Sequence, residues 1–432
     1  MLQTFKNAWK IEDLRKKMIF TAFVLVIYRL GCAIAVPFID PTALKAMISA
    51  GDGNMLGYIN LMSGGAFANA TLFALGVIPY INSSIIITLL TVAIPYLENL
   101  SKEGEEGRKK IAKITRYVAI VIAFVLALGY YFVLKNNLHA LLYTKGFEGF
   151  FAAVVIISSF VAGSMLLMWM GEQIDKKGIG NGVSLIIFTG IISRFSNTAT
   201  YFVALFKQGL DGKKINFVLV PLFIIFAIAV IAFAVVLNNA ERRIPVQYAK
   251  RVVGRKMMGG QSTHLPIKVN MSGVMPVIFA GSIMSLPGTI ISFFNIKNEL
   301  ADKILSIFDY NGLLYAIGYV LLIIAFNYFY VTMQYNPVEI ANNLRKNNGV
   351  IPGFRPGKQT QDFISRVLSK LTFIGAVFLA VVAILPIITG NLTNTGIQLG
   401  GTSILIVVGV ALEVAQQLES QMVMRHHKGF LE

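Results

Sequence analysis

The chain has few of the residues that usually carry out chemistry. It holds one cysteine, Cys32, so no intramolecular disulfide can form, and we interpret this residue as a small apolar filler. Its four histidines show no metal-ligand spacing with cysteine or carboxylates. The glycine-rich stretches GGAFANA and GIGNG lack the lysine of a phosphate-binding loop. We therefore expect no metal, no cofactor and no enzymatic activity, so that any work across a membrane needs energy from a partner.

Charged residues are also scarce. Only 14% of the residues are charged, 56% are hydrophobic and the mean hydropathy is +0.68, which is too apolar for a soluble protein of this length. A membrane-spanning helix needs about 20 mostly apolar residues. Ten runs meet this requirement, so the sequence predicts an all-α membrane protein with ten transmembrane helices. The runs cover residues 18–38, 71–94, 117–134, 151–170, 183–206, 216–237, 271–294, 312–334, 371–389 and 400–418.

The 38 lysine and arginine residues are distributed unevenly between the two sides that these spans define. One side receives 28 of them, in the N-terminal segment, alternate loops and the C-terminal tail, whereas the other side receives eight. Loops rich in lysine and arginine stay in the cytoplasm. Because ten is an even number, the sequence predicts that both termini are cytoplasmic.

The ten runs divide evenly into an N-terminal half, residues 1–206, and a C-terminal half, residues 207–432. Two basic cytoplasmic loops, at about 238–270 and 335–370, are longer than a helix connection requires, which is typical of functional loops. Between the first two runs, the segment Leu56 to Ala70 is rich in glycine, too short to cross a membrane and too apolar for water. We interpret it as a broken or re-entrant helix, which is tolerated in a membrane only where it is buried or lines a cavity.

Ionisable groups are rare inside the predicted spans, where they are costly and usually functional. The candidates are Arg29, Arg194 and Glu413, and for each we favour an internal ion pair or a position near a helix end over a proton relay. Ten helices with one broken element suit both a secondary transporter and a channel, and a transporter needs at least one essential polar group in mid-membrane. A membrane-embedded transferase or protease would need a nucleophile, metal or carboxylate set, and we find none in the sequence.

Aliphatic side chains recur at helical spacing at Val77, Ile81 and Ile85, and again at Val183 and Ile187 after the GIGNG turn. Such stripes are more often ordinary helix packing than the lining of a pore. The broken segment and the scarcity of ionisable groups favour the pore-lining interpretation only slightly.

Seven stretches of the sequence closely resemble the SecY family, the channel subunits of the bacterial Sec translocon. They follow the family order over almost the whole chain, which makes the resemblance highly specific. The stretches are NLMSGGAFANATLFALGVIPYINSSIIITLLTV at 60–92, EGEEGRKKIAKITRY at 103–117, GEQIDKKGIGNGVSLIIFTGI at 171–191, ERRIPVQYAKR at 241–251, QSTHLPIKVNMSGVMPVIFA at 261–280, PGFRPGKQT at 352–360 and GGTSILIVV at 400–408.

This resemblance implies two inverted, pseudo-symmetric halves that conduct unfolded secretory polypeptides across the membrane and release membrane proteins sideways into lipid. Residues 56–68 resemble the family's re-entrant plug helix, represented here by Leu56, Gly57, Ser63, Gly64, Gly65 and Ala66. The implied pore ring consists of Val77, Ile81, Val183, Ile187, Ile278 and Ile406. An aliphatic ring offers a sliding chain no charge or fixed hydrogen bond, and its dewetting resists water and ions.

The family also has a lateral gate, formed by the second and third helices on one side and the seventh and eighth on the other. Its polar candidates in this chain are Asn82, Thr88 and Asn270. The two long basic loops resemble the family's docking site for the motor ATPase SecA and for the ribosome, where basic side chains pair with acidic surfaces or RNA phosphates. The docking residues so implied are Arg242, Arg243, Lys250, Arg251, Arg355 and Lys358.

The resemblance further implies small membrane subunits similar to SecE and SecG as partners. Signal peptides and unfolded secretory polypeptides are the implied substrates, and membrane lipids surround the channel. The implied location is the bacterial inner (plasma) membrane.

Overall fold

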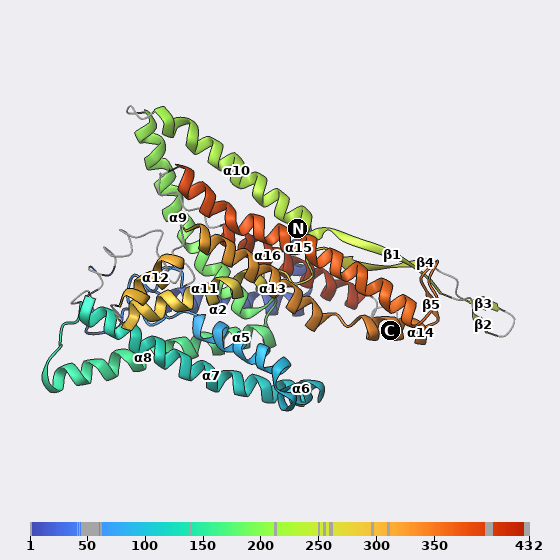
Figure 1. The fold of residues 1–432 in the computed structure, drawn as a ribbon, viewed down its shortest axis with the longest axis horizontal. Helices are drawn as coiled ribbons and strands as arrows, with labels where there is room; N and C mark the ends of the chain where they lie inside the picture. Colours follow the sequence, from blue (N-terminus) through green and yellow to red (C-terminus); the bar gives the residue numbers. More distant parts are fainter. Residues whose placement is uncertain are drawn as a thin grey trace.

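The computed structural model describes residues 2–40, 42, 44, 60, 63–137, 140–210, 214–248, 251–253, 256–258, 262–294, 298–308, 312–393 and 401–426. Helices dominate this part of the chain and pack into an elongated bundle (Figure 1). Each of the ten predicted apolar runs overlaps one helix. These helices are α2 (Glu12–Gly31), α5 (Ile78–Ala93), α7 (Glu105–Phe132), α8 (Gly146–Lys177), α9 (Gly182–Leu210), α10 (Lys214–Asn239), α11 (Met275–Phe294), α13 (Leu313–Gln334), α15 (Lys358–Thr393) and α16 (Gly401–His426).

Six helices of the described residues are long and apolar enough to cross a membrane on their own. Four of them lie within α8, α10, α15 and α16, one covers α7 and continues to Lys135, and one covers α13 and continues to Lys346. The bent pair α5 and α6 (Pro95–Lys102) adds a seventh span if it is counted as one, and α9 and α11 contain shorter apolar stretches. The all-α membrane architecture predicted from composition is therefore confirmed, with five of the ten helices before residue 211 and five after it.

Proline sets the sharp end of α5. The chain turns by 99° between α5 and α6. Ile94, at the break, is extended, with φ −107° and ψ 114°. The ring of the following Pro95 disfavours helical geometry at the preceding residue and removes one backbone donor. The span therefore stops at Ala93, and the short helix α6 leads across the surface to the start of α7.

A small β-structure stands where the sequence predicted a long loop at 238–270. Strand β1 (Glu241–Tyr248) pairs antiparallel with β4 (Ser262–Lys268) and with β5 (Gly349–Val350), and β2 (Arg251–Val253) pairs with β3 (Lys256–Met258). In β1, Ile244 and Val246 are buried while their neighbours are exposed, which is the alternation of a half-buried strand. This pattern of every second residue was present in the sequence, but the strands were not predicted from it.

The second predicted loop, at about 335–370, is also largely regular. It contains α14 (Pro337–Lys346) and β5, and α15 begins at Lys358. Apolar residues of β1, β4, α14 and α15 form one hydrophobic cluster beneath the strands, in which Ile364 is fully buried. We name this unit of β1, β4, β5 and α14, which packs on α15, the platform. It projects from one end of the molecule, and the helix α12 (Glu299–Ile307) lies at the other end (Figure 1).

Both chain ends meet in the structure. Thr4, in α1 (Leu2–Lys10), donates a hydrogen bond to the carboxylate of Glu419 in α16 at 3.0 Å. Lys17, in α2, donates to Gln421 at 3.3 Å. The first and last helices therefore reach the same end of the bundle, as an even number of spans requires. The predicted boundary between halves at residue 206 falls inside α9, which continues to Leu210.

Residues 63–70 form a compact run of turns between α2 and α5, which we name the 63–70 segment. The sequence predicted a plug helix through residue 68, and this part of the prediction is wrong. Gly64 and Gly65 have φ values of 64° and 88°, which lie in the left-handed region that a right-handed helix cannot contain. Leu56 and Gly57 lie outside the described residues.

Candidate functional site

Six aliphatic side chains from both halves of the chain meet in one hydrophobic cluster. They come from α5 and the residue before it, from α9, from α11 and from α16. Five are at most 4% exposed, and Val183 is partly buried against the same cluster. The structure thus brings together the residues implied as a pore ring, which are Val77, Ile81, Val183, Ile187, Ile278 and Ile406.

The turn before α9 positions two of these side chains. The Asp175 carboxylate, at the end of α8, accepts a hydrogen bond from the Gly182 amide at 2.7 Å. The Asn181 side chain accepts one from the Ser184 amide at 3.0 Å. These acceptors satisfy amides that have no partner inside the first turn of a helix. They fix the start of α9, and therefore the direction in which Val183 points.

An ion pair holds α7 against α8 near the same turn. The Arg116 guanidinium forms two hydrogen bonds with the Glu172 carboxylate, at 2.5 and 2.6 Å. A two-pronged pair of this kind fixes geometry as well as adding energy. Because α8 carries Asp175, the pair also steadies the acceptor that caps α9.

The 63–70 segment lies against the cluster of the six ring residues. Ala66 is fully buried and belongs to this cluster, and Ser63 is 1% exposed. Gly64 is buried and Gly65 is half-buried. The described residues predicted as a plug therefore lie beside the residues predicted as a constriction.

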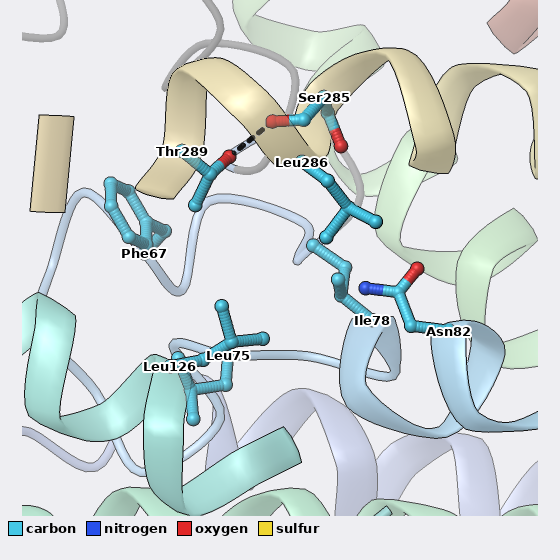
Figure 2. Close-up of a pocket in the computed structure, with 8 residues that line it drawn as sticks. All are labelled: Phe67, Leu75, Ile78, Asn82, Leu126, Ser285, Leu286 and Thr289. Atoms are coloured by element: carbon cyan, nitrogen blue, oxygen red, sulfur yellow. Dashed lines mark hydrogen bonds between the residues drawn. The ribbon is translucent and has the colours of Figure 1, made fainter. Parts of the chain in front are cut away.

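A small cavity lies in the seam between α5, α7 and α11, next to the 63–70 segment. Figure 2 shows its lining from all four elements. Its volume of about 20 Å³ is enough for one water molecule. The lining residues are Phe67, Leu75, Ile78, Asn82, Leu126, Ser285, Leu286 and Thr289. Since α11 contacts both α5 and α7, these helices are closed against one another along the seam.

The three predicted gate residues occupy different environments. Asn82 is 3% exposed, and neither its amide oxygen nor its amide nitrogen has a hydrogen-bond partner among the described residues. Thr88 donates to the Ser84 carbonyl of its own helix at 2.7 Å. Asn270 lies before α11 and donates to Asn238 at 2.7 Å. Of the three, Asn82 alone lines the cavity of the seam (Figure 2).

Two polar residues of the seam were missed from the sequence. Ser285 and Thr289 in α11 face the cavity across from Asn82, and Thr289 donates to the Ser285 carbonyl at 2.7 Å (Figure 2). Their spacing of four residues places them on one face of a helix. That spacing was the available signal, within a run that otherwise reads as uniformly apolar.

The ionisable residues predicted inside the spans have separate roles. Arg29 lies in the last turn of α2, which is one of the two expected positions, and it donates to the backbone carbonyl of Gly64 at 3.3 Å. This partner is a main-chain oxygen 35 residues away, which leaves no trace in side-chain composition. Glu413 is exposed on α16, and Arg194 is half-buried on α9.

Arg355 is held at the surface of the platform. Its side chain is exposed, whereas its backbone is fixed on both sides. Its amide donates to the Gln359 side chain at 3.2 Å, and its carbonyl accepts from the Thr360 hydroxyl at 2.9 Å. The structure therefore presents this guanidinium from a fixed point at the start of α15.

The other predicted docking residues lie on or near the same platform. Arg242 and Arg243 are exposed on β1, and Arg243 pairs with Glu241 at 2.7 Å. Arg251 begins β2, and Lys358 is exposed at the first position of α15. Lys250 lies outside the described residues. The strands β1 and β2, which carry three of these residues, project from one end of the molecule (Figure 1).

Comparison with known proteins matches this arrangement. The family model SecY matches residues 71–415. The protein translocase subunit SecY of Halalkalibacterium halodurans is 42% identical over 435 residues, and that of Bacillus subtilis is 43% identical over 435 residues, with the full length of each chain covered.

Two solved structures share the fold at lower identity. One, reported for the plug domain of a SecY protein that stabilises the closed translocation channel and maintains a membrane seal, has a TM-score of 0.65 and 22% identity. It covers 95% of this chain and 92% of its own. The other is Sec61 in a canine ribosome-channel complex from the endoplasmic reticulum, with a TM-score of 0.59, 20% identity and coverage of 95% and 93%. On the matching family model and the full-length relatives together, the chain belongs to the SecY family.

Proposed function

We infer that this chain is the protein-conducting channel subunit of a protein translocase. Its relatives at 42% and 43% identity over their full length are named as subunits of that machine. The observation that carries the inference is the meeting of six aliphatic side chains from both halves beside the buried 63–70 segment. A constriction of this chemistry suits the passage of polypeptides of any sequence.

The constriction works by offering no preferred partner. Ile81, Ile187 and Ile278 present only methyl and methylene groups, so a passing chain finds no charge or fixed hydrogen bond at which to stop. In the absence of a passing chain, the packed ring excludes water, and the 63–70 segment covers it. The channel itself supplies no energy for movement, and a partner drives the chain through.

The seam between α5, α7 and α11 serves as the lateral gate. Its lining is mainly apolar, with Asn82, Ser285 and Thr289 as its polar groups among the residues of Figure 2. When these helices separate, a segment inside the channel is exposed to lipid and partitions by its own hydrophobicity. The uncompensated amide of Asn82 lowers the cost of that separation, because opening lets water reach it.

The platform is the docking surface for the partner that supplies energy. A motor ATPase of the SecA type and the ribosome both offer negative surfaces that suit Arg242, Arg251 and Arg355. A ribosome-bound Sec61 complex with the same fold supports the second partner. Small membrane subunits similar to SecE and SecG complete the channel in a bacterial inner membrane, with both termini in the cytoplasm.

Site-specific crosslinking tests the channel function. A photoreactive amino acid at Ile187 should capture a stalled, hydrophilic secretory precursor in vesicles that contain this chain, the small membrane subunits and the motor ATPase with ATP. The matched control places the same group at Ile225 of α10, which is 65% exposed on the outside of the described bundle. We expect capture at 187 and none at 225.

Equal capture at both positions, or none at 187 in vesicles that are active with a known translocase, would refute the channel assignment. Saturable uptake of a small solute by the same vesicles would instead favour a secondary transporter.

A further inference from the structure

Side chains of two helices donate hydrogen bonds to the main chain of the 63–70 segment. The Tyr28 hydroxyl of α2 donates to the Ser63 carbonyl at 3.4 Å, and the neighbouring Arg29 guanidinium donates to the Gly64 carbonyl at 3.3 Å. Further along, the Tyr130 hydroxyl of α7 donates to the Phe67 carbonyl at 2.7 Å. The segment is therefore fastened at three points through its backbone.

A close backbone crossing fixes the opposite side of Gly64. A Cβ atom added to Gly64 would lie 2.7 Å from the Gly190 Cα of α9 and 3.1 Å from the Tyr28 hydroxyl oxygen. A Cβ added to Gly190 would lie 3.3 Å from the Gly64 Cα. Real Cβ atoms do not approach as closely as the first of these distances, so Gly64 is clamped between α2 and α9. Gly190 lies three residues after Ile187, and the crossing is thus one helical turn from the constriction.

The two ends of the segment are fastened differently. At the Phe67 end, the Phe67 ring stacks on Tyr130 with centroids 4.5 Å apart, and Tyr130 is fully buried against Phe160. Two residues of this end also join the preceding chain, because Val36 donates to the Ala70 carbonyl at 3.1 Å and Thr71 pairs with Ala35. This end is a fixed base.

The Gly64 end has longer bonds and a charged donor. Both hydrogen bonds that α2 donates to this end exceed 3.2 Å, and Arg29 is half-buried. A guanidinium within a membrane span needs acceptors, and losing the Gly64 carbonyl is costly unless water or another carbonyl replaces it. Release of this end is therefore coupled to the arrival of water or of a polypeptide backbone in the channel.

We propose that Tyr28, Arg29 and Gly190 form a latch that holds the Gly64 end of the 63–70 segment in the closed position. The latch opens while the base at Phe67 and Tyr130 stays fastened. This proposal rests on the channel function proposed above, since a latch has meaning only where the segment moves.

Ion leakage from vesicles in the absence of motor and precursor tests the latch. Tyr28→Phe removes one hydroxyl and keeps the ring that stacks on Phe73, so the leak should rise about three- to tenfold. Arg29→Met should raise the leak at least as much as Tyr28→Phe does. Arg29→Lys keeps a charged donor, so its leak should be closer to that of the parent. Gly190→Ala should also leak, because its methyl group displaces Gly64.

The matched control is Tyr328→Phe in α13. Its hydroxyl also donates to a backbone carbonyl, that of Ser369, but it does not touch the segment. We expect its leak to equal that of the parent. A leak from Tyr28→Phe and Arg29→Met no greater than from Tyr328→Phe would overturn the latch.

Translocation of a secretory precursor, measured in the same vesicles, separates the possible failures. Full translocation by the leaky variants shows that they are folded and supports the latch. If the parent translocates and the variants neither leak nor lose activity, the latch fails alone. If the parent vesicles translocate nothing under conditions in which a known translocase is active, the channel function fails as well.

Discussion

The proposed constriction is built from single aliphatic side chains. Ile81 and Ile187 are 4% and 1% exposed and come from α5 and α9. Two other ring positions, Val77 and Val183, hold valine. If these residues form the seal of the proposed channel, the seal depends on the aliphatic character that valine and isoleucine share.

Replacing both Ile81 and Ile187 with aspartate should make the closed channel leak. Two carboxylates retain water in the constriction and end its dewetting, so we expect ion conductance to rise at least about tenfold. Single-channel recording of the reconstituted protein measures this. The double valine variant is the control and should seal like the parent, and a conductance of the aspartate variant equal to the parent would contradict the ring.

A second prediction at the residue scale concerns Arg355. Its exposed guanidinium stands on a fixed backbone at the start of α15, so Arg355→Glu should reverse a charge without disturbing the fold. We expect motor-driven translocation to fall at least about tenfold, because an interface charge pair becomes a repulsion. ATP-dependent export into vesicles measures the effect.

Lys16→Glu is the matched reversal for Arg355→Glu. Lys16 is exposed and lies in α2, where it pairs with Glu12 away from the platform. Translocation by this variant should match the parent. Normal export by Arg355→Glu, with unchanged thermal unfolding, would rule out the docking role.

The sequence names the individual ring residues but not the hydrogen-bond partner of Arg29. Val77, Ile81 and Ile278 could be named because they lie in stretches that resemble a known family. The partner of Arg29 could not be named, because Gly64 offers only its carbonyl oxygen, and every residue has one. Contacts of side chains with the main chain depend on the path of the backbone, which composition does not encode.

At the scale of elements, the seam between α5 and α11 carries one uncompensated polar group. Asn82 is buried there without a partner among the described residues. A buried amide without a hydrogen bond costs about 1–3 kcal/mol. Asn82→Leu should remove this cost from the closed seam and add apolar contact with Leu286, so that the gate opens less readily.

We expect Asn82→Leu to lower the lateral insertion of a marginally apolar segment about fivefold, while a strongly apolar segment still inserts. Protease protection of the segment after insertion measures both. Thr88→Val is the control in the same helix, because the Thr88 hydroxyl already donates to the Ser84 carbonyl in the closed seam. Removing this hydroxyl therefore removes no buried polar group that lacks a partner. Equal insertion by all three proteins would show that the seam does not depend on Asn82.

The helices were more predictable than the strands and turns. Each apolar run of about 20 residues was expected to become a span, and each overlaps a long helix, although several of these helices extend well past the apolar run, as α15 does at its start. The strand β1 was missed because its alternation covers only Ile244 and Val246, and arginines surround them. Residues 56–68 were expected to form a plug helix because they resemble that element of the family, whereas the left-handed geometry at Gly64 shows that residues 63–68 do not form a regular helix.

The whole molecule has two ends that differ in charge and structure. The platform projects from one end (Figure 1). The first and last helices contact each other through Thr4 and Glu419. Lysine and arginine concentrate in the loops of one side. The two observations together predict one orientation for the whole bundle.

Cysteine labelling with a membrane-impermeant maleimide tests this orientation. The native Cys32 is 7% exposed and should stay unlabelled in the folded protein. New cysteines at Gln3 and Ser420 should react in inverted vesicles only, whereas one at Thr144, in the connection before α8, should react in intact cells without their outer membrane. Labelling of Gln3→Cys and Thr144→Cys from the same side would contradict the orientation.

The fastening of the 63–70 segment has a consequence for how its sequence can change. Tyr28, Arg29 and Tyr130 all hold peptide oxygens, which are present whatever residue occupies the position. Substitutions elsewhere in the segment leave these hydrogen bonds intact, provided that glycine stays at positions 64 and 65 and the aromatic ring stays at position 67. The anchoring of the segment therefore constrains three of its positions more than the others, and sequence variation should concentrate at the remaining ones.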